Sequence, residues 1–301
     1  MKHIKRSTGD KITDAIIVLI TGAFTLLCLY PFWYMLMFTF SAPTTVTRGL
    51  YLIPRNFSLY NIMRILELPG IYRATFISIA RTVSGTALTV FCCSVLGYLF
   101  TKPEMPFRSF IYRAIIITMY VSGGLIPFFL VMRAYGLLDS FFVYIIPGAV
   151  GAFHVVLIKT FVESLPPSLE ESARIDGAGY FRIYWSIIMP LSKPIIATIC
   201  VFAAVGHWNS FFDAHIFVRN SNLWPLQYLL WRMLNETQRI ADMVRDAANI
   251  AAARDALQQR TLTPLGVRTT VTLFATIPIF LVYPFAQRYF VKGIMIGAVK
   301  G

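Results

Sequence analysis

The feature of this sequence that most limits how it can fold is the spacing of its charged residues. Uncharged stretches of 19 to 33 residues occur at six places, directly after Asp14, Arg81, Arg113, Asp139, Lys193 and Arg268. A helix that crosses about 30 Å of hydrocarbon needs roughly 20 mainly apolar residues. Hydrophobic residues make up 57% of the 301 and charged residues 14%, against ~45–50% and ~25% in soluble domains. We therefore predict an all-α integral membrane protein with six transmembrane helices, at about 15–40, 74–100, 110–132, 141–162, 194–217 and 266–290.

The lysines predict the orientation of these spans. With six spans, all eight lysines fall on the side of the N-terminus, at positions 2, 5, 11, 102, 159, 193, 292 and 300. Short loops rich in Lys and Arg are typical of the cytoplasmic side. We therefore expect both termini in the cytoplasm, in a multi-pass membrane protein. The apolar run after residue 14 is too long for a cleavable signal peptide, so we interpret it as an uncleaved first span.

This topology divides the chain into a membrane domain and its extensions. The N-terminus is 1–14, the six-helix domain is 15–290 and the C-terminal tail is 291–301. The loop 163–193 is expected inside and the loop 218–265 outside. The net charge of +13 suits contact with anionic membrane lipid, whereas no basic face with interleaved aromatic residues indicates nucleic acid.

Several kinds of chemistry have no support in the sequence. The four cysteines all lie within predicted spans and form no Cys-x-x-Cys pair, and the four histidines are scattered. We therefore predict neither a metal site nor a disulfide. No glycine-rich phosphate loop of the GxxxxGK[ST] type occurs. We expect this chain to bind no cofactor and to have no catalytic residues, so another chain would have to bind any ATP.

The most patterned stretch outside the spans begins after the proline pair at 166 and 167. Ser168 and Glu171 have the Ser-x-x-Glu spacing of a capping box, which satisfies free N–H groups at a helix start. We predict a short helix over 169–176, ended by Gly177 and Gly179, because glycine accepts the left-handed conformation of a helix C-terminus.

A second short helix is predicted to begin at about residue 180. Its face is mostly apolar: Phe181, Ile183, Tyr184, Ile187 and Ile188. Pro190 and Pro194 are expected to separate it from the fifth span. From the residues alone, a hairpin that rests on the membrane surface and a hairpin that docks on another protein are equally open.

The same stretch resembles a known family. Glu171-Ser172-Ala173, three residues, Gly177, nine residues and Ile187-Ile188-Met189-Pro190 match the "EAA" signature of ABC importer permeases, with Ser172 in place of Ala and Met189 in place of Leu. In that family the loop is a coupling helix that docks into a cleft of a cytoplasmic ATPase. The resemblance implies a type I permease fold and ATPase-coupling positions at Glu170, Glu171, Ala173, Asp176, Gly177, Gly179, Ile187 and Pro190.

Two further stretches extend the resemblance. Residues 206–213 look like the Trp-Asn-x-Phe segment of carbohydrate-type permeases, and residues 283–301 look like the tail of the oligosaccharide branch. That branch includes importers of uronate-containing fragments of alginate and pectin. The resemblance implies one permease half of an ATP-driven oligosaccharide importer in a bacterial cytoplasmic (inner) membrane, acidic substrates included. Its partners would be cytoplasmic ATPases that bind ATP and Mg²⁺, a second six-helix permease in a heterodimer, and an extracytoplasmic solute-binding protein.

Polar and aromatic residues inside the spans are candidates for the substrate path. A charge in a span is costly and is by default a functional candidate. The Arg81 side chain has two interpretations. Either it snorkels to the membrane surface or forms a structural ion pair, or it faces a water-filled path. His154 is a core histidine or a path residue. A further group of candidates lies at the end of the fifth span: Trp208, Asn209, Phe212 and Asp213. A sugar-binding site and a tight helix–helix contact explain this group equally well.

Other readings remain open. In the outer loop, residues 236–260 have apolar positions at helical spacing, which predicts an amphipathic helix that either packs over the spans or docks a binding protein. An ABC permease for a peptide or another small polar solute is the main alternative function. A membrane enzyme using Asp213 or His154 lacks paired carboxylates, and an ion-coupled transporter would need several acidic residues within the spans.

Overall fold

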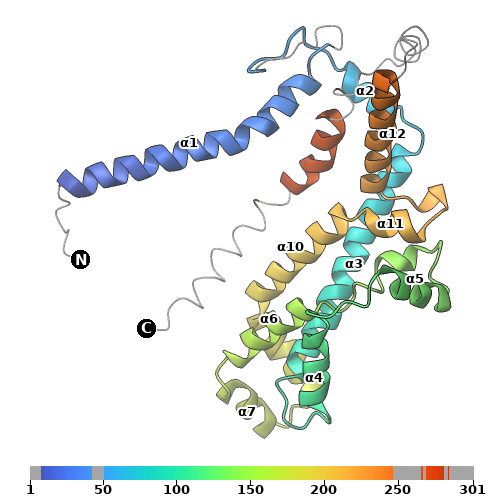
Figure 1. Ribbon diagram of the computed structural model, residues 1–301. Coiled ribbons are helices and arrows are strands. Elements are labelled where there is room, and N and C mark those ends of the chain that lie inside the picture. The colour runs from blue at the N-terminus through green and yellow to red at the C-terminus, as the bar shows by residue number, and fades with distance from the viewer. Residues whose placement is uncertain (1–7, 43–50, 247–265, 267–268, 281–283, 285–301) are drawn as a thin grey trace. The chain divides into compact units, whose positions relative to one another are not determined.

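The computed structural model describes residues 8–42, 51–246, 266, 269–280 and 284, and over these residues it is helical, with one isolated bridge between Ser41 and Phe57. Two compact units make up the chain. One comprises Met1–Pro69 and Leu234–Thr276, and the other comprises Gly70–Met233 and Ile277–Gly301. Figure 1 shows the helices of both units.

The first unit is built on one long apolar helix, α1 (Thr8–Thr39), which coincides with the span predicted at 15–40. The chain then returns to begin the short helix α2 (Tyr60–Leu66). The buried Asn61 side chain donates hydrogen bonds to the carbonyl oxygens of Thr39 and Ser41, at 3.1 and 3.0 Å. Its amide therefore satisfies carbonyl groups that the end of α1 leaves without a helical partner.

The second unit is built around α3 (Ile71–Leu99), which matches the span predicted at 74–100. α6 (Ala152–Glu163) and α10 (Lys193–Asn209) pack along it (Figure 1). Glycines on α3 allow this close approach. A Cβ added at Gly97 would lie 2.7 Å from Ile158 of α6, and one at Gly85 would lie 2.5 Å from the ring of His207 of α10.

Three predicted spans are not continuous helices. The stretch 110–132 forms α4 (Arg108–Ile117) and α5 (Leu125–Ala134), and the residue between them that precedes α5, Gly124, has φ +83°. The stretch 141–162 begins as a 3₁₀ turn, η2 (Phe141–Tyr144), and becomes α-helical only in α6. Glycine or proline lies at each of these breaks, and apolar composition sets the length of a span but not its continuity.

The fifth predicted span, 194–217, is also divided. α10 ends at Asn209, Ser210 is extended, and α11 (Phe212–Phe217) follows. By length and composition, two described helices could each cross a membrane, α1 and α3. A third crossing results if Tyr180–Leu191 and α10, which meet at an 80° bend, are taken together. The sixth predicted span is described only at 266, 269–280 and 284, with Thr269–Phe280 as an apolar helix.

The loop 218–265, which is predicted to lie outside, contains a helix that begins earlier than predicted. α12 (Leu226–Asp246) starts ten residues before the expected 236–260 and follows a 3₁₀ turn, η4 (Ser221–Leu223). Pro225 accounts for this start, because its carbonyl accepts the first helical hydrogen bonds, from the amides of Tyr228 and Leu229. Residues 247–265 and the tail 291–301 lie outside the described residues.

Candidate coupling and translocation sites

The first helix of the predicted coupling hairpin is α7 (Ser168–Ile175), but it does not start with a capping box. Pro167 is its N-cap residue, with φ −59°, and no side chain caps the helix. The amides of Glu170 and Glu171 donate to the carbonyl of Pro167 at 3.0 and 3.1 Å. The capping-box prediction was wrong because proline already holds a helical φ, so the helix starts one residue earlier and Ser168 lies inside it.

The end of α7 confirms the role predicted for Gly177. Gly177 has φ +78°, and the amide of Ala178 donates to the carbonyl of Ala173 at 2.9 Å. The amide of Gly177 donates to the carbonyl of Arg174 at 3.0 Å. These two bonds form a Schellman motif. Gly179 does not share this role, because its φ is −74° and it is the extended residue before the next helix, α8 (Tyr180–Ile183).

The second half of the hairpin is fixed in the protein core. α8 continues as a π-helical turn, η3 (Tyr184–Ile188), and as α9 (Met189–Leu191), before the bend into α10. The π turn suits Pro190, which has no N–H and clashes in a regular helix. Buried side chains of this half pack against Cys93 and Tyr98 of α3 and against residues of α6: they are Ile183, Tyr184 and Ile188. Ile187 is half-buried, and Phe181 is 79% exposed, contrary to the predicted apolar face.

The outer face of α7 is free to meet a partner. Glu171 and Asp176 are exposed, and within the described part of the chain neither forms an ion pair. Ile175 is 87% exposed beside them. Gly177 and Gly179 lie at the same exposed tip, whereas Ala173 is half-buried. Two carboxylates around an apolar side chain form a compact surface that a basic, partly apolar cleft could bind.

The inner face of α7 contacts the loop that follows α3. Glu170 forms an ion pair with Lys102, and Arg174 forms one with Glu104 at 3.1 Å. A cleft of about 400 Å³ is lined by both segments, with Glu171 included, and by residues between 162 and 167. The pKa of Glu104 lies below its ordinary value, because its backbone amide, the hydroxyl of Tyr180 and the guanidinium of Arg174 all stabilise the carboxylate.

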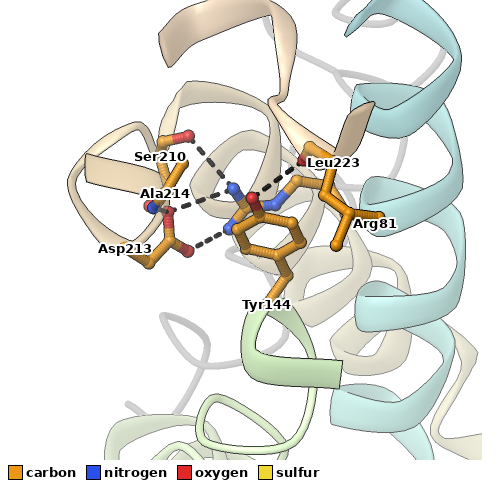
Figure 2. A network of polar contacts seen from close by, with 6 residues as sticks. All are labelled: Arg81, Tyr144, Ser210, Asp213, Ala214 and Leu223. Atoms are coloured by element: carbon orange, nitrogen blue, oxygen red, sulfur yellow. Dashed lines mark hydrogen bonds and ion pairs between the residues drawn. The ribbon is translucent and has the colours of Figure 1, made fainter. Parts of the chain in front are cut away.

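The Arg81 side chain is fully buried and paired, so it does not snorkel (Figure 2). Its guanidinium forms an ion pair with Asp213 and donates a 3.2 Å hydrogen bond to the carbonyl of Ser210. It also lies 4.5 Å from the ring centroid of Tyr144, whose hydroxyl donates to the carbonyl of Leu223 at 2.9 Å. Arg81 thus contacts both sides of the break between α10 and α11.

The other path candidates lie apart from this network. Trp208 is buried and lines a small apolar cavity of about 90 Å³ together with Thr82 of α3. Asn209 and Phe212 are exposed. His154 is half-buried on α6 and stacks on Phe202 with 6.5 Å between ring centroids. The structure therefore brings together Arg81 and Asp213, and the path roles of all six residues stay predictions.

Sequence reasoning missed several residues that build these sites. Lys102 indicated orientation only, and Glu104 and Tyr144 received no role. Their hydrogen-bond partners are 68 to 79 residues away in the chain, in the pairs Lys102–Glu170, Glu104–Arg174 and Tyr144–Leu223. No local periodicity or spacing signals such a contact. The one available signal was the rarity of charge near the spans, which did single out Arg81.

The helical bundle and its charged hairpin have the features expected of the transmembrane subunit of an ABC importer. The chain belongs to the family described as binding-protein-dependent transport system inner membrane component, whose model matches residues 90–296. It is 35% identical to Protein LplC of Bacillus subtilis (strain 168), over 99% of each chain. It is also 35% identical to the polygalacturonan/rhamnogalacturonan transport system permease protein YtcP of the same organism, over 97% of this chain and 99% of that one.

A solved structure has the same fold. It is described as a bacterial ABC transporter involved in the import of the acidic polysaccharide alginate. The match has a TM-score of 0.81 and 32% sequence identity, and it covers 95% of this chain and 99% of that chain. The predicted class, an all-α permease of the ABC importer fold, is therefore confirmed. The chain is a transport subunit and a membrane component, as its family defines.

Proposed function

We propose that this chain is one permease half of an ATP-driven importer of oligosaccharides, with acidic fragments of pectin- or alginate-like polysaccharides among its substrates. One observation carries the coupling role: α7 presents exposed carboxylates and Ile175 outward while its inner face and α8 are anchored. The names of the relatives support the substrate class, since one is named for polygalacturonan and the solved transporter for alginate.

The proposal assigns the remaining tasks to partner chains. Cytoplasmic ATPase subunits bind ATP and Mg²⁺ and receive α7, while this chain binds no cofactor. A second six-helix permease completes a heterodimer, and a solute-binding protein delivers the sugar on the outer side. Both termini then lie in the cytoplasm. Closure of the ATPases moves the hairpin as a rigid body and switches the bundle between two packings.

The Arg81–Asp213 pair bears on how an acidic sugar is recognised. Because Asp213 neutralises Arg81, this pair offers a uronate no net positive charge. An importer for uncharged sugars or for another polar solute is the alternative, and the choice rests on transport measurements. In proteoliposomes with the complete importer and its loaded binding protein, we expect ATP hydrolysis to be stimulated by oligogalacturonate or alginate oligosaccharide. Stimulation by a peptide, with none by any sugar, would contradict the substrate proposal.

The docking role is tested at the exposed carboxylate of α7. Glu171→Lys places a cation where we expect a basic ATPase cleft, so copurification of the ATPase with the permease is expected to fall about tenfold. Glu67→Lys is the matched control, because Glu67 is an exposed carboxylate of the predicted outer side that pairs with Arg64. An undiminished yield of ATPase with Glu171→Lys, together with normal transport, would rule out this contact.

A further inference from the structure

The loop that follows α3 is a direct extension of that helix. The amides of Thr101 and Lys102 donate to the carbonyls of Tyr98 and Leu99, each at 3.0 Å. The guanidinium of Arg108 donates to the carbonyl of Thr101 at 3.4 Å. These bonds hold residues 101–107, which we name the α3 loop, against the end of α3. Any force applied to the α3 loop is therefore applied to α3 itself.

Two ion pairs of opposite polarity join the α3 loop to α7. The loop supplies a cation and then an anion, Lys102 and Glu104, whereas α7 supplies an anion and then a cation, Glu170 and Arg174. Glu170 and Arg174 are four residues apart and so lie one turn apart on the same face of α7. A shift of α7 by one turn would bring like charges together. The pairs Lys102–Glu170 and Glu104–Arg174, which we name the crossed ion pairs, therefore fix both the position and the register of α7.

The inner ion pair is the more sheltered of the two. The Lys102 side chain is 9% exposed and that of Glu170 is 18% exposed. The ammonium group of Lys102 also lies 4.3 Å from the ring centroid of Tyr98, on α3. An ion pair with this little access to water is screened only weakly by salt. Removing one partner would leave a sheltered charge without compensation, which is strongly unfavourable.

The covalent route from α7 to the bundle is indirect. It passes through Gly177 and Gly179 into α8 and then turns through 80° into α10. The crossed ion pairs provide a second, non-covalent route, from α7 to α3. Since α3 packs along both α6 and α10, a displacement that reaches α3 is communicated to the centre of this unit.

We propose that Lys102 and Glu104 are positioning residues that fasten α7 to α3, so that the movement imposed by the ATPase reaches α3 instead of being absorbed within the hairpin. Glu170 and Arg174 are their partners on α7. Glu170 therefore makes its ion pair within this chain, whereas Glu171 faces the ATPase. This inference rests on the proposed coupling function and goes further by assigning the path of the force. It predicts that loss of either ion pair uncouples ATP hydrolysis from transport without dissociating the complex.

The test uses the complete importer in proteoliposomes, with oligogalacturonate and alginate oligosaccharide as probes. The quantity measured is the sugar imported per ATP hydrolysed. For Lys102→Met we expect this ratio to fall at least about fivefold, the lower end of typical coupling between sites, while the ATPase still copurifies. The matched control is Lys159→Met. Lys159 likewise pairs with a glutamate, Glu163, and lies 4.9 Å from a tyrosine ring centroid, but its ion pair stays within α6. The control is expected to keep the wild-type ratio.

The outer ion pair offers a test that does not endanger folding, because both side chains are more than 40% exposed. Glu104→Arg and Arg174→Glu each create a like-charge pair and are expected to lower the ratio. The double variant restores an ion pair and is expected to recover at least half of the wild-type ratio. A direct contact of Arg174 with the ATPase would not be rescued in this way. If the importer with Lys102→Met fails to assemble, the two single variants at positions 104 and 174 and their double variant decide the question by themselves.

Two outcomes separate this inference from the proposed function. If the wild-type importer couples ATP hydrolysis to import while Lys102→Met and Glu104→Arg couple equally well, the inference is overturned and the proposed function stands. The inference also falls if the double variant shows no recovery. If the wild-type complex itself imports neither probe and its ATP hydrolysis responds to neither, the proposed function fails first.

Discussion

At the scale of single residues, the charge of Arg81, which lies deep in a predicted span, is paired. Arg81 is 1% exposed, and it meets Asp213, a backbone carbonyl and an aromatic ring (Figure 2). A break in a membrane helix leaves backbone groups that hydrocarbon cannot satisfy. Arg81 supplies a donor to the Ser210 carbonyl at such a break, and Asp213 in turn accepts the amide of Ala214 at 2.9 Å. The pair therefore stabilises the corner between α10 and α11.

This role predicts how substitutions of the pair combine. Arg81→Met leaves the Asp213 carboxylate without its cation, and we expect a loss of about 3–5 kcal/mol in the free energy of unfolding. Asp213→Asn keeps the acceptor for Ala214 but leaves Arg81 charged and unpaired. The double variant removes both charges, so it is expected to cost less than the sum of the two single changes. Thermal unfolding of the purified importer in detergent measures all three, and strict additivity would show that the two residues do not act as a pair.

Residue chemistry explains what the sequence could and could not predict here. Arg81 was recognisable as a candidate because a charge deep in an apolar run is rare. Its partner was not recognisable, because Asp213 is 132 positions away and the sequence favoured a local group with Asn209 and Trp208. In the structure Asn209 is exposed and Trp208 lines an apolar cavity, so proximity in sequence misled the grouping.

At the scale of elements, the coupling hairpin depends on two glycines with different duties. Gly177 holds a left-handed conformation that ends α7, and Gly179 is extended before α8. The start of α7 was mispredicted, whereas Gly177 ends the helix as predicted. The difference has a physical reason. Proline at the start supplies a helical φ and displaces the serine cap, whereas only glycine enters the left-handed region at little cost.

The two glycines form a matched pair for an experiment. A Cβ at either position meets no atom within 4 Å, so alanine tests backbone conformation alone. Gly177→Ala at φ +78° is expected to destabilise the end of α7 by about 1–2 kcal/mol. Gly179→Ala at φ −74° is expected to be neutral or slightly stabilising. Hydrogen exchange of the backbone amides at positions 177 and 178 reports the difference, and equal protection in the two variants would contradict the assignment.

Continuity of the spans is the element-level property that composition could not predict. α1 and α3 follow the predicted spans at 15–40 and 74–100 closely, although Pro31 lies inside α1 and Gly85 and Gly97 lie inside α3. The region 118–124 is non-helical although it lies within an uncharged run of 19 residues. Charge spacing records where a chain can enter hydrocarbon. Whether it stays helical there depends on neighbouring groups that satisfy the freed backbone, and those groups lie far away in the sequence.

At the scale of the whole molecule, one orientation underlies every proposed role. The coupling hairpin must face the cytoplasm and the segment 51–59 must face the outside. The lysine distribution predicts this, because all eight lysines fall on the side of the N-terminus. Residues of opposite sides that are well exposed in the structure make the orientation measurable. Ile175 on α7 is 87% exposed and Ile53 is 76% exposed.

Single cysteines at these two positions test the orientation in a background without the four native cysteines. A membrane-impermeant maleimide reacts with a thiolate in water, so it cannot reach the far side of the membrane. In vesicles that hold the permease without its ATPase, which would otherwise cover Ile175, we expect Ile53→Cys to be labelled in right-side-out preparations and Ile175→Cys only in inverted ones. Val18→Cys, 70% exposed on α1 but within its apolar run, serves as the control that stays unlabelled in both. Labelling of Ile175→Cys in right-side-out vesicles would place the hairpin outside, where no cytoplasmic ATPase could reach it.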